Sequence, residues 1–235
     1  MAQNTVAQIT YFSDVLCIWA YTSQVKISQV RERFGGQVEI SHRFLRVFGD
    51  TRSRLQNEWS AKGGQSAYAD HVHGIAERFD YVPVHPDAWR RNLPASSEPA
   101  HLFCKAVQLL EERGRISSER QAQWDGRTLA EEYAWRCRCA FFRDLVDIGR
   151  RESLMNIAEQ IQLPLGDLES EIDTGRAYAA RSGDLDAKAQ FSIEGSPTFL
   201  LNQGRQKLYG NVGYRIIETN IQEILAAPEG RASWC

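Results

Sequence analysis

The chain has 235 residues, enough to bury a sizeable core in one large domain or in one domain that carries an insertion. Hydrophobic residues make up 43% of the chain and charged residues 25%, an ordinary balance for a globular protein. The formal net charge of −2 gives no reason to expect nucleic acid or an anionic membrane as a partner, and no stretch approaches the roughly 18 apolar residues of a membrane span.

The N-terminus and the cysteines bear on the cellular compartment. The first residues, MAQNTVAQITYF, lack the basic, apolar and cleavage-site segments of a signal peptide. The five cysteines are odd in number and irregularly spaced, which argues against a disulfide framework. We therefore expect a cytoplasmic protein. The histidines show no metal-ligand spacing, so we expect no metal site and a surface or loop position for each.

The first 45 residues have a strand–helix–strand pattern. Residues 6–12 alternate between apolar and polar and are rich in β-branched and aromatic side chains, which predicts a strand. A helical pattern follows and ends at Gly35-Gly36, and residues 38–44 predict a second strand. A βαβ unit of this kind has parallel strands.

Helical periodicity dominates the middle of the chain. Residues 98–114 and 128–149 each predict an amphipathic helix, the second with a stripe from Leu129 to Ile148, and the pattern returns at 154–161. Residues 50–99 give a less regular pattern, for which we expect loops and short helices.

The strand pattern returns near the C-terminus. Residues 197–202 and 207–209 predict a hairpin, and an amphipathic helix follows from Tyr214. The layout is βαβ, a helical block and ββα: an α/β fold with a large all-helical insertion. The predicted domains are 1–47 with 191–228 as one discontinuous thioredoxin-like unit, 48–190 as the helical insertion domain, and 229–235 as a mobile tail.

The motif FSDVLCIWAY at residues 12–21 places Cys17 between a strand and the start of a helix. Unpaired N–H groups and the helix dipole favour a thiolate there, which predicts a lowered thiol pKa. Trp19 would supply a flat apolar contact beside the sulfur. Cys17 as a small core residue is the alternative, since free cysteines are commonly buried.

The motif GSPTFLLN at residues 195–202 places Pro197 at the beginning of an internal strand, where proline removes a hydrogen-bond donor. A cis Ser196–Pro197 bond would turn the preceding backbone outward, so that it could pair with an extended peptide or with glutathione. A trans proline that merely starts the strand is the alternative.

Together these features resemble the DsbA family of thioredoxin-fold proteins, and most closely its FrnE-like branch, which is related to 2-hydroxychromene-2-carboxylate isomerases and kappa-class glutathione transferases. The resemblance spans nearly the whole chain and implies a thioredoxin-like fold. The family pattern SDVVCPWCY stands here as SDVLCIWAY, so Asp14, Cys17, Trp19 and Tyr21 match.

The resemblance implies roles for individual residues. Cys17 would be the catalytic nucleophile. The substrate-binding residues would be Trp19, Ala20, Ser196 and Pro197, and the supporting residues would be Asp14, Ile18, Tyr21 and Thr198.

Two positions depart from the family pattern: Ile18 replaces the usual proline, and Ala20 replaces the resolving cysteine. Because Ala20 cannot resolve a mixed disulfide, Cys17 would have to be released by an external thiol. Two origins of Ala20 stay open: an engineered trap, or natural drift of the whole motif, to which the departure at Ile18 points.

The other cysteines are weak redox candidates. Cys137 and Cys139 would point about 200° apart on a helix and could not bridge each other. We expect Cys137 and Cys104 to be packed in the core, and Cys139 to reach Cys17 only if the insertion folds over the site. Four tryptophans would line a groove or pack in the core: Trp59, Trp89, Trp124 and Trp135.

Three functions remain open. The first is a monothiol thiol–disulfide oxidoreductase acting on a protein or small-molecule thiol or disulfide, as a monomer or homodimer, without a tightly bound cofactor and with glutathione as a candidate co-substrate. The second is a glutathione-dependent isomerase or transferase, which Val212-Gly213 weakens because the kappa-class pattern has Ser-Asp there. The third is a peptide-binding module in which Cys17 is vestigial.

Overall fold

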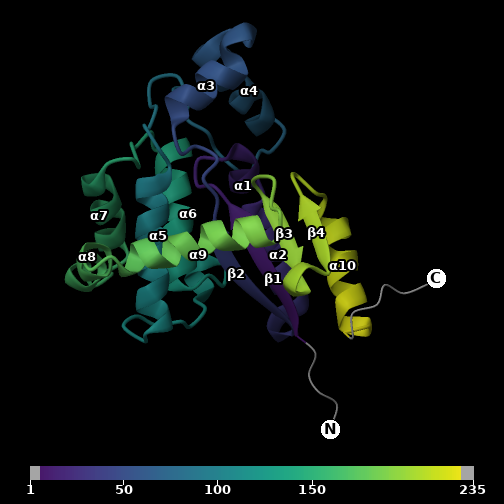
Figure 1. Ribbon diagram of the computed structural model, residues 1–235. Coiled ribbons are helices and arrows are strands. Elements are labelled where there is room, and N and C mark those ends of the chain that lie inside the picture. Colours follow the sequence, from purple (N-terminus) through teal and green to yellow (C-terminus); the bar gives the residue numbers. More distant parts are fainter. Residues whose placement is uncertain (1–5, 229–235) are drawn as a thin grey trace.

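The computed structural model describes residues 6–228, and the predicted mobile tail at 229–235 with its Cys235 lies outside the described residues. One mixed sheet has the strand order β2-β1-β3-β4 (Figure 1). Its strands are β1 (Ala7–Ser13), β2 (Val38–Phe44), β3 (Thr198–Leu201) and β4 (Gln206–Tyr209). As predicted, β1 and β2 are parallel and β3 and β4 form a hairpin, while β3 runs antiparallel to β1.

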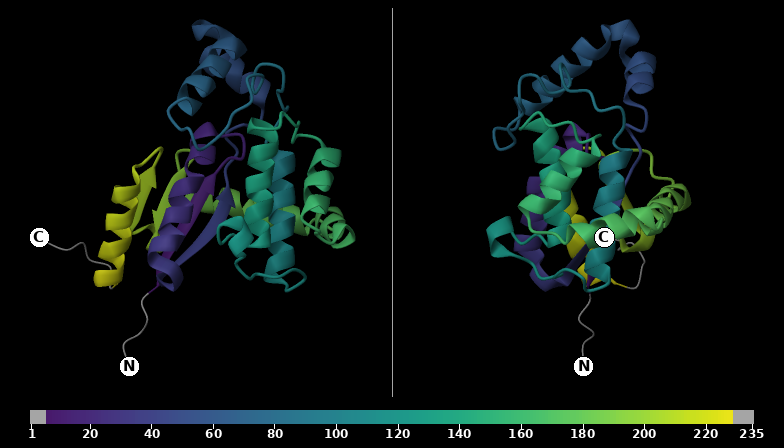
Figure 2. Two further views of the ribbon diagram at one scale, coloured as in Figure 1. Left: turned by 180° about the vertical axis from the view of Figure 1, so that it is seen from behind. Right: turned by 90° about the vertical axis from the view of Figure 1, so that its left-hand side faces the viewer.

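Two long helices cover one face of the sheet. Helix α1 (Ile18–Thr22) leads into α2 (Gln24–Phe34), which ends at Gly35 with a φ of 51°, a conformation that favours glycine. Helix α10 (Tyr214–Ala226) closes the fold beside α2 (Figure 2). Because side chains alternate along a strand, every second residue of β1 and β3 points to these helices. The buried cluster there includes Ile9, Tyr11, Ile27, Val30, Phe199, Leu201, Ile217 and Ile221.

The insertion between β2 and β3 is helical throughout its regular structure, as predicted. Its helices are α3 (Thr51–Trp59), α4 (Gly64–Ala76), α5 (Glu98–Glu112), α6 (Leu129–Phe142), α7 (Arg151–Gln160), α8 (Leu165–Asp173) and α9 (Arg176–Gln190). The last of them, α9, reaches the other face of the sheet, where Ala187 packs with Phe12 and Leu200. Within residues 6–228, no helix combines the length and the hydropathy needed to cross a bilayer.

Residues 50–99 contain α3, with nine residues, and α4, with 13, among loops, as the sequence predicted. The end of α6 differs from the prediction. Helix α6 ends at Phe142 instead of continuing to Ile148, because Leu145 takes a left-handed φ of 57° that breaks the helix. Ile148 is nevertheless fully buried. The apolar pattern thus predicted correctly that Ile148 is buried, but not that it lies outside the helix.

One buried apolar cluster joins the insertion to the start of the fold. Val15, Leu16 and Tyr21 belong to the same cluster as residues of α4, α5 and α6. Helices α3 and α4 stand over α1 at one end of the molecule (Figure 1). The junction between β1 and α1 is therefore held by both the sheet and the insertion.

Side chains from the insertion occupy the outer edge of β2. The Gln108 amide donates a hydrogen bond to the His42 carbonyl at 3.0 Å. The Phe44 N–H donates to the Asp184 carboxylate at 3.0 Å, and Arg181 donates to the Phe44 carbonyl at 2.8 Å. These side chains take the place of a further strand at this edge.

Candidate active site

Cys17 lies in the segment between the end of β1 and the start of α1, directly before Ile18. It is the N-cap residue of α1, with an extended backbone at φ −83° and ψ 117°. The N–H groups of Ala20 and Tyr21 donate to its carbonyl oxygen at 3.1 and 3.0 Å, which closes the first turn of the helix. The structure thus places Cys17 where the sequence predicted it.

The second motif meets Cys17 although 179 residues separate them in the chain. The Cys17 thiol donates to the Ser196 carbonyl oxygen at 3.4 Å, and the Ser196–Pro197 peptide bond is cis. The Ser196 hydroxyl accepts the Asp14 N–H at 2.9 Å, and the Thr198 hydroxyl donates to the Gly195 carbonyl at 2.7 Å. Both sides of the loop are therefore fixed beside the sulfur.

Asp14 is a buried anchor for this junction. Its side chain has no exposed surface and accepts N–H bonds from Leu16, Val47 and Phe48 at 2.8–2.9 Å. Ser97 donates its hydroxyl to the same carboxylate at 2.8 Å. Burial alone would raise the pKa of Asp14, but His101 and the N–H donors outweigh it, and the pKa lies below its ordinary value.

A cavity of about 440 Å³ opens beside Cys17. Ile18 and Trp19 line it from α1, and Gly195 and Ser196 line it from the loop before β3. The insertion supplies a further part of the wall: Arg54, Trp59, Lys62, Tyr68 and His71. The cavity therefore lies between the thioredoxin-like part and the insertion. Of the four tryptophans that were candidates for lining a groove, only Trp59 lines this cavity.

Other predicted site residues lie behind this wall. Ala20 is 1% exposed and Pro197 is buried, and neither lines the cavity. Tyr21 is stacked between Trp135 and Phe142, with ring centroids 5.1 and 4.8 Å away. Its hydroxyl donates to the Pro83 carbonyl at 3.1 Å.

The electrostatics of Cys17 differ from the sequence-based expectation. Burial raises the pKa of the Cys17 thiol above its ordinary value, and contacts with Ser196, Ala20 and Trp19 counteract this rise only in part. Helix α1 has only five residues, so its dipole is a weak counterweight. The predicted lowering of this pKa is therefore wrong, because burial shifts it in the opposite direction.

Several site residues were not recognised from the sequence. His101 was expected on the surface or in a loop, but it is fully buried on α5, where its Nε2 accepts the Val15 N–H at 3.2 Å. His42 was also expected on the surface or in a loop, but it lies on β2 and its side chain is largely buried. Tyr68 of α4 faces the cavity, and burial together with the nearby Cys17 raises the pKa of its hydroxyl. Tyr68 begins a stripe with Val72 and Ile75, which was a readable helix signal.

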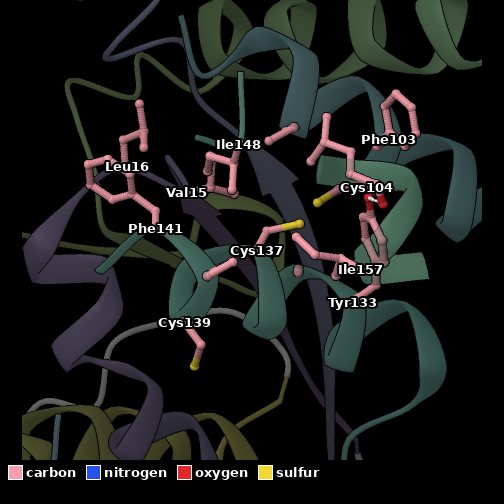
Figure 3. Close-up of a cluster of buried hydrophobic side chains, with 14 of the residues drawn as sticks. Val15, Leu16, Phe103, Cys104, Tyr133, Cys137, Cys139, Phe141, Ile148 and Ile157 are labelled. Atoms are coloured by element: carbon pink, nitrogen blue, oxygen red, sulfur yellow. Dashed lines mark hydrogen bonds between the residues drawn. The ribbon is translucent and has the colours of Figure 1, made fainter. Parts of the chain in front are cut away.

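The remaining cysteines lie away from the site. Cys104 and Cys137 are fully buried between α5 and α6, and Figure 3 shows the Cys139 sulfur pointing away from this pair. Cys139 lines a separate cavity of about 460 Å³ that shares no lining residue with that of Cys17. Burial raises the pKa of the Cys139 thiol to about 11. In this conformation Cys139 is not placed to resolve a mixed disulfide at Cys17.

Comparison with known proteins supports the fold assignment. No protein-family model matches the sequence, and no curated protein matches it. Solved structures do match across nearly the full length. A structure described as a probable DsbA oxidoreductase from Streptomyces coelicolor is 18% identical with a TM-score of 0.70, over 97% of this chain and 93% of that chain.

Two further structures match at similar quality. The cytosolic disulfide reductase DsbM from Pseudomonas aeruginosa with GSH is 17% identical with a TM-score of 0.63, over 92% of this chain and 99% of that one. A 2-hydroxychromene-2-carboxylate isomerase is 14% identical with a TM-score of 0.63, over 92% and 95% of the two chains. At these identities the likeness concerns the fold alone, and the chain has a thioredoxin-like fold with a large helical insertion between β2 and β3.

Proposed function

We propose that this protein is a DsbA-like thiol–disulfide oxidoreductase that works through Cys17 alone. The observation that carries the proposal is the position of the thiol, 3.4 Å from the Ser196 carbonyl at the wall of a cavity. Gly195 and Ser196 line the cavity next to the sulfur, and their backbone would dock a peptide or glutathione by backbone pairing. Ser196 and Pro197 would form this docking loop, and Trp19 would contact the substrate from α1.

The reaction is a thiol–disulfide exchange in two steps. Cys17 loses its proton to solvent, and its thiolate attacks one sulfur of a disulfide R–S–S–R, forming Cys17–S–S–R and releasing R–S⁻, which takes up a proton. An external thiol then attacks the R sulfur of the mixed disulfide, and Cys17 leaves as a thiolate that is reprotonated. One half of the substrate disulfide is thus released as R–SH, and the other half leaves as a mixed disulfide with the external thiol.

The raised pKa of Cys17 favours this reducing direction. A thiol of high pKa is a poor leaving group, so its mixed disulfide is long-lived, whereas a strong oxidant of the DsbA type has a stabilised thiolate. Ala20, only 1% exposed, offers no second sulfur for intramolecular release. We therefore infer a monothiol reductant that depends on an external thiol.

Glutathione is the external thiol that we propose. DsbM, whose fold this chain shares, is a cytosolic disulfide reductase with a solved structure that holds GSH. A reducing compartment such as the cytoplasm would suit the four free cysteines that the structure describes, Cys17, Cys104, Cys137 and Cys139. The FrnE-like assignment within the group remains a prediction.

The test is to expose the folded protein to glutathione disulfide and to map adducts on peptides by mass spectrometry. We expect an adduct on Cys17, its removal by added glutathione, and no comparable labelling of buried Cys104. A Cys17→Ser variant should give no adduct. Absence of a Cys17 adduct in the wild type, or turnover of an aromatic electrophile with glutathione in the Cys17→Ser variant, would contradict the proposal.

A further inference from the structure

The cavity beside Cys17 carries an excess of positive charge. Arg46 of the β2–α3 loop, Lys62 after α3 and Lys188 near the end of α9 all line it, and we call these three residues the cation rim. For residues 6–228, the structure describes no ion pair or hydrogen bond to a carboxylate for any of the three. They come from three separate segments that meet only in the folded chain.

The acidic residues of the cavity leave this charge largely uncompensated. Glu58 is paired with Arg54 at 2.9 Å, so that pair is neutral. Glu194 is the one remaining carboxylate among the described lining residues. Three cations without a carboxylate partner among the described residues therefore face one carboxylate around the thiol.

The side chain of Arg46 packs against Gly49. A Cβ built on Gly49 would lie 2.4 Å from Cγ and 2.7 Å from Cδ of Arg46, closer than real side-chain contacts. The aliphatic part of Arg46 thus lies over the bare backbone of Gly49, and any larger residue there would displace it. The aliphatic part of Arg46 thus has a packing contact at Gly49, whereas no described carboxylate pairs with its guanidinium.

The shape of the site favours a small substrate. Helices α3 and α4 stand over α1 (Figure 1). Arg54 and Trp59 of α3 and Tyr68 of α4 line one side of the cavity. At about 440 Å³ the cavity falls within the ~300–1,000 Å³ range of small-molecule sites. A disulfide within a folded protein would have to fit against these residues to reach Cys17, which is only 7% exposed.

We propose that the substrates of Cys17 are low-molecular-mass disulfides that carry carboxylates, and that Arg46 and Lys188 are the residues that select them. This rests on the proposed thiol–disulfide exchange at Cys17. The rim attracts an anionic disulfide into the cavity and holds its carboxylate while the Cys17 thiolate attacks the sulfur. A cationic disulfide is repelled by the same residues.

The test compares three small disulfides: anionic dithiodipropionate, neutral hydroxyethyl disulfide and cationic cystamine. The rate of adduct formation on Cys17 is measured for each and divided by the rate of the same reagent with the neutral thiol N-acetylcysteine amide. We expect the corrected anionic rate to exceed the cationic rate by about tenfold or more at low salt, and this ratio to shrink as salt is added.

Variants locate the selection. Arg46→Glu and Lys188→Glu should each lower the anionic-to-cationic ratio, and the double variant should invert it. Gly49→Ala should lower the ratio without changing any charge, since it displaces Arg46. Arg52→Gln, an exposed arginine of α3 that does not line the cavity, should leave the ratio unchanged.

The outcomes separate the two proposals. If none of the three reagents modifies Cys17, the thiol–disulfide exchange itself fails. If the neutral reagent modifies Cys17 but the charged reagents react at equal corrected rates, only the charge selection is overturned. It is also overturned if the disulfides of insulin react with Cys17 faster, after the same correction, than dithiodipropionate does.

Discussion

The hydroxyl of Ser97 donates a hydrogen bond to the buried carboxylate of Asp14 at 2.8 Å. Ser97 directly precedes α5 of the insertion, whereas Asp14 follows β1 and lies three residues before Cys17. The same carboxylate holds the β2–α3 loop through Val47 and Phe48. One side chain thus joins three segments around the reactive thiol, and the insertion is part of the site rather than an appendage.

Replacing Asp14 by Asn should cost stability. In the wild type, four buried donors share the two oxygens of the Asp14 carboxylate. An amide has only one acceptor oxygen, and its NH₂ group would face some of these donors. Each donor left without an acceptor costs ~1–3 kcal/mol. We expect Asp14→Asn to lower the free energy of unfolding by about 3 kcal/mol or more in urea titrations at pH 7. The control is Asp186→Asn on α9, where the carboxylate is exposed and the change should be within about 0.5 kcal/mol.

Asp14 should also shape the acid sensitivity of the fold. Its pKa is lower in the folded chain than the unfolded value of about 3.9, so its stabilisation is complete above that pH and is lost as the pH falls through the folded pKa. Urea titrations between pH 6 and pH 3, as approximate limits, should show a steeper loss for the wild type than for Asp14→Asn. Parallel curves for the two proteins would contradict this assignment.

The Cys17 thiol should titrate above the ordinary cysteine value of about 8.5, because burial disfavours the thiolate. The measurement is the pH dependence of iodoacetamide alkylation, followed on the Cys17 peptide by mass spectrometry. The same peptide in urea-unfolded protein is the reference and should titrate near the ordinary value. A folded-state pKa well below neutrality would show that the helix start dominates after all.

Ala20→Cys should restore intramolecular release. The Ala20 N–H donates to the Cys17 carbonyl at 3.1 Å, so the two residues are joined by a single helical turn, as in C-x-x-C sites. The glutathione adduct of Cys17 should then disappear without added thiol and be replaced by a disulfide between Cys17 and the introduced cysteine, which peptide mapping detects. Ala20→Ser is the matched control, and its adduct should persist. A persistent adduct in both variants would show that the turn cannot close around two sulfurs.

Asp184 should be needed to hold α9 on the sheet. It is fully buried, accepts the Phe44 N–H at 3.0 Å and pairs with Lys105 at 3.1 Å and Arg43 at 3.2 Å. Asp184→Asn leaves the buried ammonium of Lys105 unpaired and should lower the free energy of unfolding by about 3 kcal/mol. Adding Lys105→Met should recover part of this loss, whereas additive losses in urea titrations would show that the two groups do not interact.

The sequence predicted the sheet and its flanking helices because their patterns are local. Alternation in residues 38–44 and the spacing of apolar residues after Tyr214 each reflect one buried face. The bounds of α3 were not predicted because it has few apolar residues, although Asp50 caps it by accepting the Ser53 N–H at 2.9 Å, a signal present in the sequence.

The site was only partly predictable. Cys17 and Ser196 belong to motifs that can be recognised separately, so their meeting followed from the fold. The thiol pKa did not follow from it, because it depends on how deeply the insertion buries the sulfur. Arg46 and Lys188 carry no local pattern, and their common place beside Cys17 arises only from the packing of α9 and the β2–α3 loop.

The capped edge of β2 has a consequence for synthesis of the chain. Phe44 leaves the ribosome 140 residues before Asp184, the residue that occupies its N–H. At ~5–20 residues per second, Asp184 is therefore synthesised roughly 7 to 28 seconds after Phe44, and the outer edge of β2 lacks this partner for that time. Strand β1 waits longer for its neighbour β3, since Ile9 pairs with Leu201. Through most of translation β1 and β2 therefore lack the partners that cover both of their outer edges in the folded chain, and such unpaired edges favour pairing with other chains.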